Sequence, residues 1–157
     1  IDIHGARCSC GDYGCLESLV NAQALVHSVR GLLKVGRDSQ LSGRADYDTV
    51  TLDDVLRAAE QGDPLCREEL CRIADYLAVG VRNIATIYAP ECIVLAGGLI
   101  CECSYLLEAV LERVERWRNS KFVKSLNVVG CSFGKDQCAM GAIALVLQRF
   151  YTVIKLD

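Results

Sequence analysis

Three cysteines near the start of the chain have the residue type and the spacing of a metal site. Cys8, Cys10 and Cys15 lie in the pattern C-x-C-G-x-x-G-C. The two glycines of this pattern permit tight backbone turns, so the three thiolates can converge on one ion. Zinc prefers four tetrahedral ligands, commonly three cysteines and one histidine in structural sites. The pattern therefore predicts a structural zinc ion bound in a loop that spans residues 4–15.

Two other interpretations of these cysteines stay open, a disulfide bond or three unconnected thiols. A disulfide between Cys8 and Cys10 would be strained by their closeness in sequence, and any single pairing leaves an odd thiol. His4 is the only histidine near enough in sequence to serve as a fourth ligand. His27, the other histidine, falls in the next predicted helix, where an ordinary helix residue is expected.

Cysteine usage also bears on the setting of the protein. The chain has 10 cysteines in 157 residues, about 6%, which is less than a disulfide scaffold requires. Cys101 and Cys103 flank an expected helix start, with no histidine or third cysteine close by in sequence to complete a metal site. This usage favours a reducing, cytoplasmic setting with one special cluster. Five others lie among apolar residues and are predicted to be small buried side chains: Cys66, Cys71, Cys92, Cys131 and Cys138.

Composition excludes several classes of protein. The chain is 52% hydrophobic and 24% charged, as expected of a globular domain, and 157 residues are enough for one domain. Charged residues or glycines interrupt every apolar run, so no membrane span is predicted. The net charge is −3, and the basic residues are densest over 113–124, next to Glu112 and Glu115. This pattern does not fit a nucleic-acid surface, which needs concentrated positive charge.

The elements that must position the cysteine loop are mainly helices. Apolar residues at helical spacing predict a helix over 16–33, followed by a polar surface loop over 36–50. Thr51 and Asp54 form a capping-box pattern, with aspartate in place of glutamate, that opens a helix ending near Glu60. A long helix is predicted over 64–88, because Asp63 and Pro64 suit its first positions and Ala89-Pro90 ends it.

The second half of the chain alternates strands and helices. An unbroken apolar run predicts a buried strand over 92–96, and a second strand is predicted over 126–131, with helices over about 102–118 and 137–150. This order is typical of an α/β unit with parallel strands. Weaker strand signals lie at 1–3 and 151–156. A stable sheet usually needs three or more strands, so we expect the sheet to be incomplete at its beginning.

The segment CSCGDYGCLE, residues 8–17, resembles the signature of the ROK family, which groups bacterial sugar-responsive repressors and sugar kinases. Further segments follow in the order of the family. Residues 59–64 resemble its A-x-x-G-D linker, residues 93–98 its glycine turn after a core strand, and residues 140–144 its terminal G-A-A helix. The resemblance covers the chain from residue 1 to about residue 150.

The resemblance implies a two-domain actin-like ATPase (ribonuclease H-like) fold. Residues 1–157 would form a single C-terminal ROK-type domain, an α/β, helix-rich part of that fold. Because the chain begins with Ile1 rather than methionine, we expect that an N-terminal portion of the protein is absent. In the family the zinc histidine belongs to a Gly-His pair that would lie upstream of Ile1. The resemblance therefore does not assign His4 as the inherited ligand.

Glu17 is the candidate sugar-binding residue. The glutamate that follows G-C-L in the family contacts a sugar hydroxyl, and a carboxylate is a strong acceptor for hydroxyl donors. From the residues alone, Glu17 is also typical of an exposed helix glutamate that complements the helix dipole. Under the resemblance, zinc would act structurally by fixing the loop that orients Glu17.

Gly97 and Gly98, in a turn spanning 96–99, could let a nucleotide approach the backbone after the predicted strand. A plain strand-to-helix turn explains the same residues. Family kinases often carry a third glycine there, and this chain has Leu99. That departure weakens the prediction of ATP binding, which would apply only to a kinase.

Two classes of function follow from the resemblance. We favour the sugar-sensing and self-association domain of a ROK-type transcriptional regulator, which would contact DNA only through an absent N-terminal domain. The alternative is the C-terminal half of an ATP-dependent ROK sugar kinase, although the family's catalytic aspartate lies outside this chain. The expected ligand is a sugar or sugar phosphate, the expected assembly is a homo-oligomer, and no membrane contact is expected. A bare structural zinc module is the third possibility.

Overall fold

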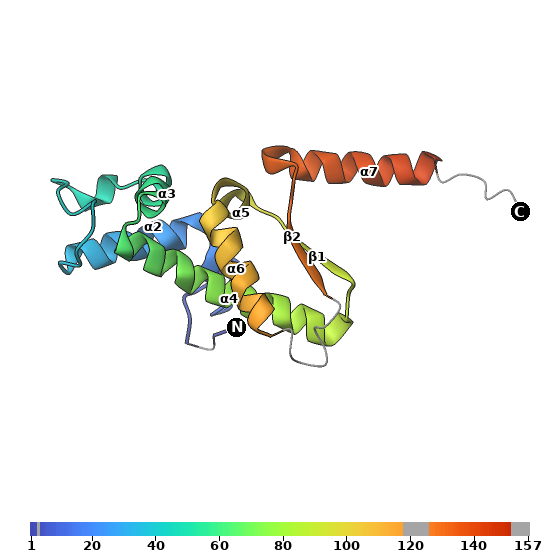
Figure 1. The fold of residues 1–157 in the computed structure, drawn as a ribbon, viewed down its shortest axis with the longest axis horizontal. Helices are drawn as coiled ribbons and strands as arrows, with labels where there is room; N and C mark the ends of the chain where they lie inside the picture. The colour runs from blue at the N-terminus through green and yellow to red at the C-terminus, as the bar shows by residue number, and fades with distance from the viewer. Residues whose placement is uncertain (3, 118–125, 152–157) are drawn as a thin grey trace, which may run out of the picture.

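The computed structural model describes residues 1–2, 4–117 and 126–151 (Figure 1). Seven helices and two strands make up the described fold, with short 3-10 turns at Tyr47–Thr49 and Gly134–Asp136. In chain order the elements are α1 (Leu16–Val20), α2 (Ala22–Lys34), α3 (Leu52–Glu60), α4 (Pro64–Tyr88), β1 (Cys92–Leu95), α5 (Gly98–Glu102), α6 (Ser104–Arg116), β2 (Asn127–Gly130) and α7 (Gln137–Tyr151).

Helices α2, α3, α4 and α6 pack around one hydrophobic core, which we call the helical body. Helix α4 is central, since α1, α2, α3 and α6 all contact it. Each fully buried leucine, isoleucine or valine contributes about 1.5–3 kcal/mol to the free energy of folding. The core includes Leu25, Val29, Leu70, Ile73, Leu106 and Val110, all without solvent exposure.

Two helices of the helical body, α3 and α4, begin at the predicted capping residues. Thr51 and Asp54 form the reciprocal capping box of α3, as expected. Asp63 caps α4 by accepting a hydrogen bond from the backbone N–H of Cys66 at 2.8 Å, with Pro64 in the first turn. Ala89 ends α4 in the left-handed conformation, directly before Pro90. The predicted bounds of α3 and α4 are thus confirmed within one residue.

The prediction of one continuous helix over 16–33 is wrong. Asn21 has an extended backbone (φ −85°, ψ 162°) and separates α1 from α2. Its side-chain oxygen accepts a hydrogen bond from the backbone N–H of Ala24 at 2.7 Å. Asparagine competes with the helical backbone in this way, so it starts a new helix although the apolar periodicity continues across it.

The two strands pair in parallel, as the alternating pattern predicted. The register joins Cys92 to Asn127 and Leu95 to Gly130. Along β1 the side chains alternate between the core and solvent, so Ile93 packs against the helical body while Val94 is 58% exposed. Within the described residues the sheet has only these two strands. We refer to β1, β2 and α7 together as the strand end of the molecule.

Three further predicted elements differ from the structure at their ends or throughout. The helix predicted over 102–118 is confirmed as α6, which begins at Ser104 after the extended backbone of Cys103 (φ −131°, ψ 94°) and ends at Arg116; residue 118 lies outside the described residues. The short helix α5 before it was not predicted. Of the weak strand at 1–3, Ile1 and Asp2 are not in a strand, and residue 3 lies outside the described residues. The weak strand at 151–156 is wrong at Tyr151, which ends α7; residues 152–156 lie outside the described part.

The prediction of five buried cysteines holds only for Cys66. Cys71 and Cys131 are half-buried, whereas Cys92 and Cys138 are exposed. Cys92 occupies an outward position of the alternating strand β1, where an apolar neighbourhood in sequence does not imply burial. Helix α7, which carries Cys138, extends away from the helical body (Figure 1). Among the described helices, none is long and apolar enough to span a membrane.

Candidate metal and ligand site

The fold brings together the three cysteines of the C-x-C-G-x-x-G-C pattern. The sulfur atoms of Cys8, Cys10 and Cys15 all lie within 4.8 Å of one another. The Sγ atoms of Cys10 and Cys15 are 3.6 Å apart. A tetrahedral zinc ion with Zn–S bonds of about 2.3 Å separates its sulfur ligands by about 3.8 Å. The arrangement therefore fits a tetrahedral metal ion of that size.

Short backbone hydrogen bonds hold the cysteine loop in this shape. The N–H of Cys8 donates to the carbonyl of Asp12 at 2.7 Å, and the N–H of Gly11 donates to the carbonyl of Cys8 at 3.0 Å. Gly14 has φ +64° and packs so closely that an added Cβ would lie 1.4 Å from the carbonyl oxygen of Asp2. No other residue type fits that position without moving the backbone.

The three thiols perturb one another electrostatically. The neighbouring thiols of Cys10 and Cys8 raise the pKa of Cys15 to about 11, since a thiolate there would face other sulfur atoms. A backbone hydrogen bond at Cys10 lowers the pKa of Cys8. A bound divalent cation supplies the positive charge that lets clustered thiols ionise together, so this chemistry also suits a metal.

Neither histidine joins the cysteine cluster. Among the described residues the metal-capable group consists of the three cysteines alone, so the structure does not bring the His4 ring to them. His4 is exposed, and its backbone N–H donates to the Asp2 carboxylate at 2.9 Å. His27 lies on α2, as predicted, where it lines a cavity next to the loop.

Glu17 lies at the edge of that cavity, in the first turn of α1. The helix begins directly after Cys15, so the position of the last loop cysteine determines where the Glu17 side chain starts. Its Oε2 atom is 4.0 Å from the Cys8 sulfur. The cysteine loop and the candidate ligand residue therefore form one continuous unit.

The cavity has a volume of about 640 Å³, and apolar atoms supply most of its surface, although most of its lining residues carry a polar or charged group. The cysteine loop and α1 form one side, α2 forms the other, and Arg72 reaches it from α4. Its guanidinium also pairs with the buried carboxylate of Glu69 at 2.9 Å. The polar and charged lining residues are Arg7, Ser9, Glu17, Ser18, Asn21, Gln23, His27, Ser28 and Arg72.

Sequence reasoning missed most of this lining. Gln23 and His27 are four residues apart on α2, and that spacing places them on one helix face. The helical period could therefore have paired these two residues. Arg72 comes from a helix more than 40 positions further along the chain, and only the packing of α4 against α1 and α2 brings it in.

Gly97 and Gly98 form the predicted turn between β1 and α5. Gly97 has φ +127°, a conformation that favours glycine, and Gly98 is the first residue of the five-residue helix α5. A second hollow of about 310 Å³ lies there, lined in part by Gly97, Gly98 and Leu99. Asn21 lines both this hollow and the cavity beside Glu17. The structure brings the glycine turn near the α1–α2 junction and not to the cysteine cluster.

Comparison with known proteins gives a consistent result. The ROK family model matches residues 1–149. The chain is 31% identical over 153 residues to the DNA-binding transcriptional dual regulator NagC of Escherichia coli strain K12, covering 98% of this chain and 36% of that protein. It is 29% identical over 148 residues to a glucokinase of Halalkalibacterium halodurans, covering 92% of this chain and 44% of that protein.

A solved structure agrees with these relatives. A ROK family transcriptional regulator that is a homolog of the E. coli MLC protein superposes with a TM-score of 0.78 at 29% identity. The match covers 96% of this chain and 37% of that chain. Our chain thus spans less than half the length of the relatives it matches. Because the family model and these relatives match almost the whole chain, the chain belongs to the ROK family.

Proposed function

We propose that the chain is the sugar-sensing and self-association domain of a ROK-type transcriptional regulator. The observation that carries this proposal is the position of Glu17, which lines a cavity and lies directly beside the cysteine loop. The similarity to NagC along almost the whole chain supports a regulator. In this proposal residues 1–157 form a C-terminal domain of the actin-like fold, and a separate N-terminal domain contacts DNA.

In this proposal, Glu17 accepts hydrogen bonds from hydroxyl groups of a sugar or sugar phosphate. Cys8, Cys10 and Cys15 would hold a structural zinc ion, whose chemistry is to cross-link the loop. The fourth ligand would come from outside the described residues. Because α1 begins immediately after Cys15, a rigid loop keeps the Glu17 carboxylate at the edge of the cavity. The cysteines thus act as positioning residues, and Glu17 contacts the ligand.

The setting proposed for the protein is the reducing cytoplasm, which keeps the metal-binding thiols reduced. Self-association is supported by the apolar side chains that the strand end exposes, Val94, Val129, Leu145 and Phe150 among them. Large exposed apolar patches are typical of protein interfaces.

An ATP-dependent sugar kinase is the second candidate, and the similarity to the H. halodurans glucokinase supports it. In that case Gly97 and Gly98 would let ATP approach the backbone. Leu99 follows them where family kinases often have a third glycine, and this residue favours the regulator.

Titration of the full-length protein with sugars and sugar phosphates, followed by calorimetry, tests the proposal. Glu17→Gln should weaken binding at least about tenfold, because a charge-assisted hydrogen bond becomes a neutral one. Glu108→Gln changes an exposed glutamate on α6 that does not line the cavity, so it should bind like the parent. Unchanged affinity in Glu17→Gln would remove Glu17 from the site. Phosphorylation of a sugar by the full-length protein in the presence of ATP would contradict the regulator proposal and support the kinase.

A further inference from the structure

One pair within the cysteine cluster, Cys10 and Cys15, is more exposed than Cys8. Cys10 is exposed and Cys15 is half-buried, whereas Cys8 is only 7% exposed. The Sγ atoms of Cys10 and Cys15 lie 3.6 Å apart. An S–S bond is about 2.05 Å long, so a relative movement of about 1.5 Å would close that gap. Solvent and small oxidants reach this pair more easily than Cys8.

The backbone around the pair is already folded for such a bond. Gly11 and Gly14 lie between the two cysteines and have φ of +97° and +64°. These two glycines reverse the direction of the chain between Cys10 and Cys15, so the backbone needs no additional turn to bring the two cysteines together. A bond between Cys8 and Cys10 would instead join residues two positions apart, which is strained. The backbone N–H and carbonyl of Cys8 are also held by hydrogen bonds inside the loop.

We propose that Cys10 and Cys15 form a reversible disulfide that prevents metal binding, so that the loop beside Glu17 has a reduced, metal-binding form and an oxidised, metal-free form. Formation of the disulfide does not depend on the proposed sugar function. Only a consequence of the disulfide for sugar binding rests on that function. A disulfide sulfur is no longer a thiolate, so two of the three metal ligands are lost together. Cys8 alone then remains beside Glu17, with its Sγ 4.0 Å from Oε2.

Hydrogen peroxide is the oxidant in this step. The Cys10 sulfur attacks one peroxide oxygen, the O–O bond breaks, and Cys10 becomes a sulfenic acid while one water leaves. The Cys15 sulfur then attacks the Cys10 sulfur, and the sulfenic hydroxyl leaves as a second water with the thiol proton. Two thiols and one peroxide thus give one disulfide and two waters, and a dithiol reductant reverses the change.

Peptide mapping tests the bond directly. Asp12 lies between the two cysteines, so cleavage before aspartate separates them unless a disulfide joins the fragments. Reduced protein, loaded with zinc chloride, is treated with peroxide, and metal release is followed with a chromogenic chelator. We expect a linked Cys10–Cys15 peptide, loss of two hydrogen masses, and release of zinc in step with the bond. Dithiothreitol should reverse all three changes.

Variants separate the proposal from general oxidation. Cys10→Ser and Cys15→Ser should each lose the linked peptide, whereas Cys8→Ser should retain it. Cys92→Ser and Cys138→Ser remove exposed cysteines outside the cluster and should behave like the parent. Absence of the linked peptide, or zinc that stays bound once the peptide has formed, would overturn the proposal. Peptide mapping tests the disulfide even if the protein binds no sugar. Failure of the proposed sugar function can therefore be distinguished from failure of the disulfide proposal.

Discussion

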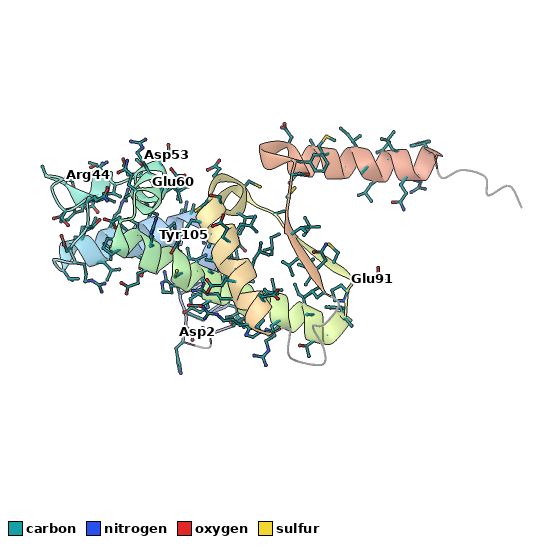
Figure 2. The ribbon with its side chains drawn as sticks, in the orientation of Figure 1. Asp2, Arg44, Asp53, Glu60, Glu91 and Tyr105 are labelled. Carbon is teal, nitrogen blue, oxygen red and sulfur yellow. The ribbon has the colours of Figure 1, made fainter. Side chains whose placement is uncertain are left out.

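The helical body and the strand end differ in how deeply their apolar side chains are buried. In the helical body, Leu25 of α2, Leu70 and Ile73 of α4, and Leu106 of α6 are completely buried. The end of α4 that leads to β1 exposes Ile84 and Ile87. At the strand end, one face of β1 and β2 and much of α7 are exposed, and α7 extends beyond the rest of the molecule (Figures 1 and 2). Similar side chains thus form a finished core in one region and an open surface in the other.

Helix capping separates three helices before β1 from two that follow it. Asn21, Thr51 and Asp63 each cap a helix of the helical body with a side-chain hydrogen bond. Helices α5 and α6, which follow β1, begin at Gly97 and Cys103 without such a bond. Helix α6 belongs to the helical body even so, and its buried side chains, Leu106 and Val110, hold it there. The strand end instead has the composition of a surface that another chain or segment covers.

The largest effect should come from removing a buried side chain of the helical body. Leu70 has 0% exposure, so Leu70→Ala leaves a cavity and should lower the free energy of unfolding by about 2–5 kcal/mol. Leu145, on α7, is 69% exposed, and Leu145→Ala should cost less than about 0.5 kcal/mol. Urea unfolding monitored by circular dichroism measures both. Equal losses would remove the distinction between the two regions.

The second effect concerns Asp63, a carboxylate with no solvent exposure. Its oxygens accept hydrogen bonds from the Cys66 N–H, the Ser39 hydroxyl and the Gln40 N–H, so it joins the loop after α2 to the start of α4. Asp63→Ala should lower the free energy of unfolding by about 2 kcal/mol, because it removes the cap and leaves buried donors unpaired. Exposed Asp53, the matched control on α3, should cost a few tenths when changed to alanine.

The Asp63 contribution should depend on pH. Burial raises the pKa of this carboxyl, but the hydrogen bonds from Cys66, Gln40 and Ser39 together lower the pKa by more than burial raises it. The pKa of Asp63 in the folded protein therefore lies below its ordinary value. The unfolded chain therefore binds the proton more readily, and stability rises with pH in this range. The stabilisation is fully present above the ordinary pKa of about 3.9 and is lost as pH falls through the lower folded pKa. Urea unfolding at pH 6 and pH 3 should show a smaller difference between parent and Asp63→Ala at the lower pH; a constant difference would contradict this.

The smallest effect on stability should come from α7, where the effect on assembly should be large. Leu145→Glu places a charge on an exposed apolar face and should leave urea unfolding of the dissociated protein within about 0.5 kcal/mol of the parent. If that face lies in the proposed self-association interface, sedimentation velocity should show dissociation. Glu108→Gln, on α6, is the control. An unchanged sedimentation coefficient would move the interface elsewhere.

Local signals predicted the helical body better than the site. The bounds of α3 and α4 followed from Thr51, Asp54, Asp63 and Pro64, because capping chemistry acts within one turn. The break at Asn21 was missed because apolar periodicity continues across it. The cysteine cluster could be predicted because its residues lie within eight positions, but Arg72 joins the cavity only through tertiary packing. Burial of Cys92 and Cys138 was wrong, because local apolar context does not show which side of an element faces the core.

Helix α4 has a mechanical consequence. Arg72 lines the cavity, and the same unbroken helix continues to Tyr88, next to the strand end. At a rise of 1.5 Å per residue, about 24 Å of rigid rod separate these two residues. A tilt of about 5° at Arg72 would displace the far end by about 2 Å, comparable to the helix shifts that reset subunit interfaces. Helix α4 is therefore long enough to convert a small tilt at the cavity into a displacement at the strand end, where apolar side chains are exposed.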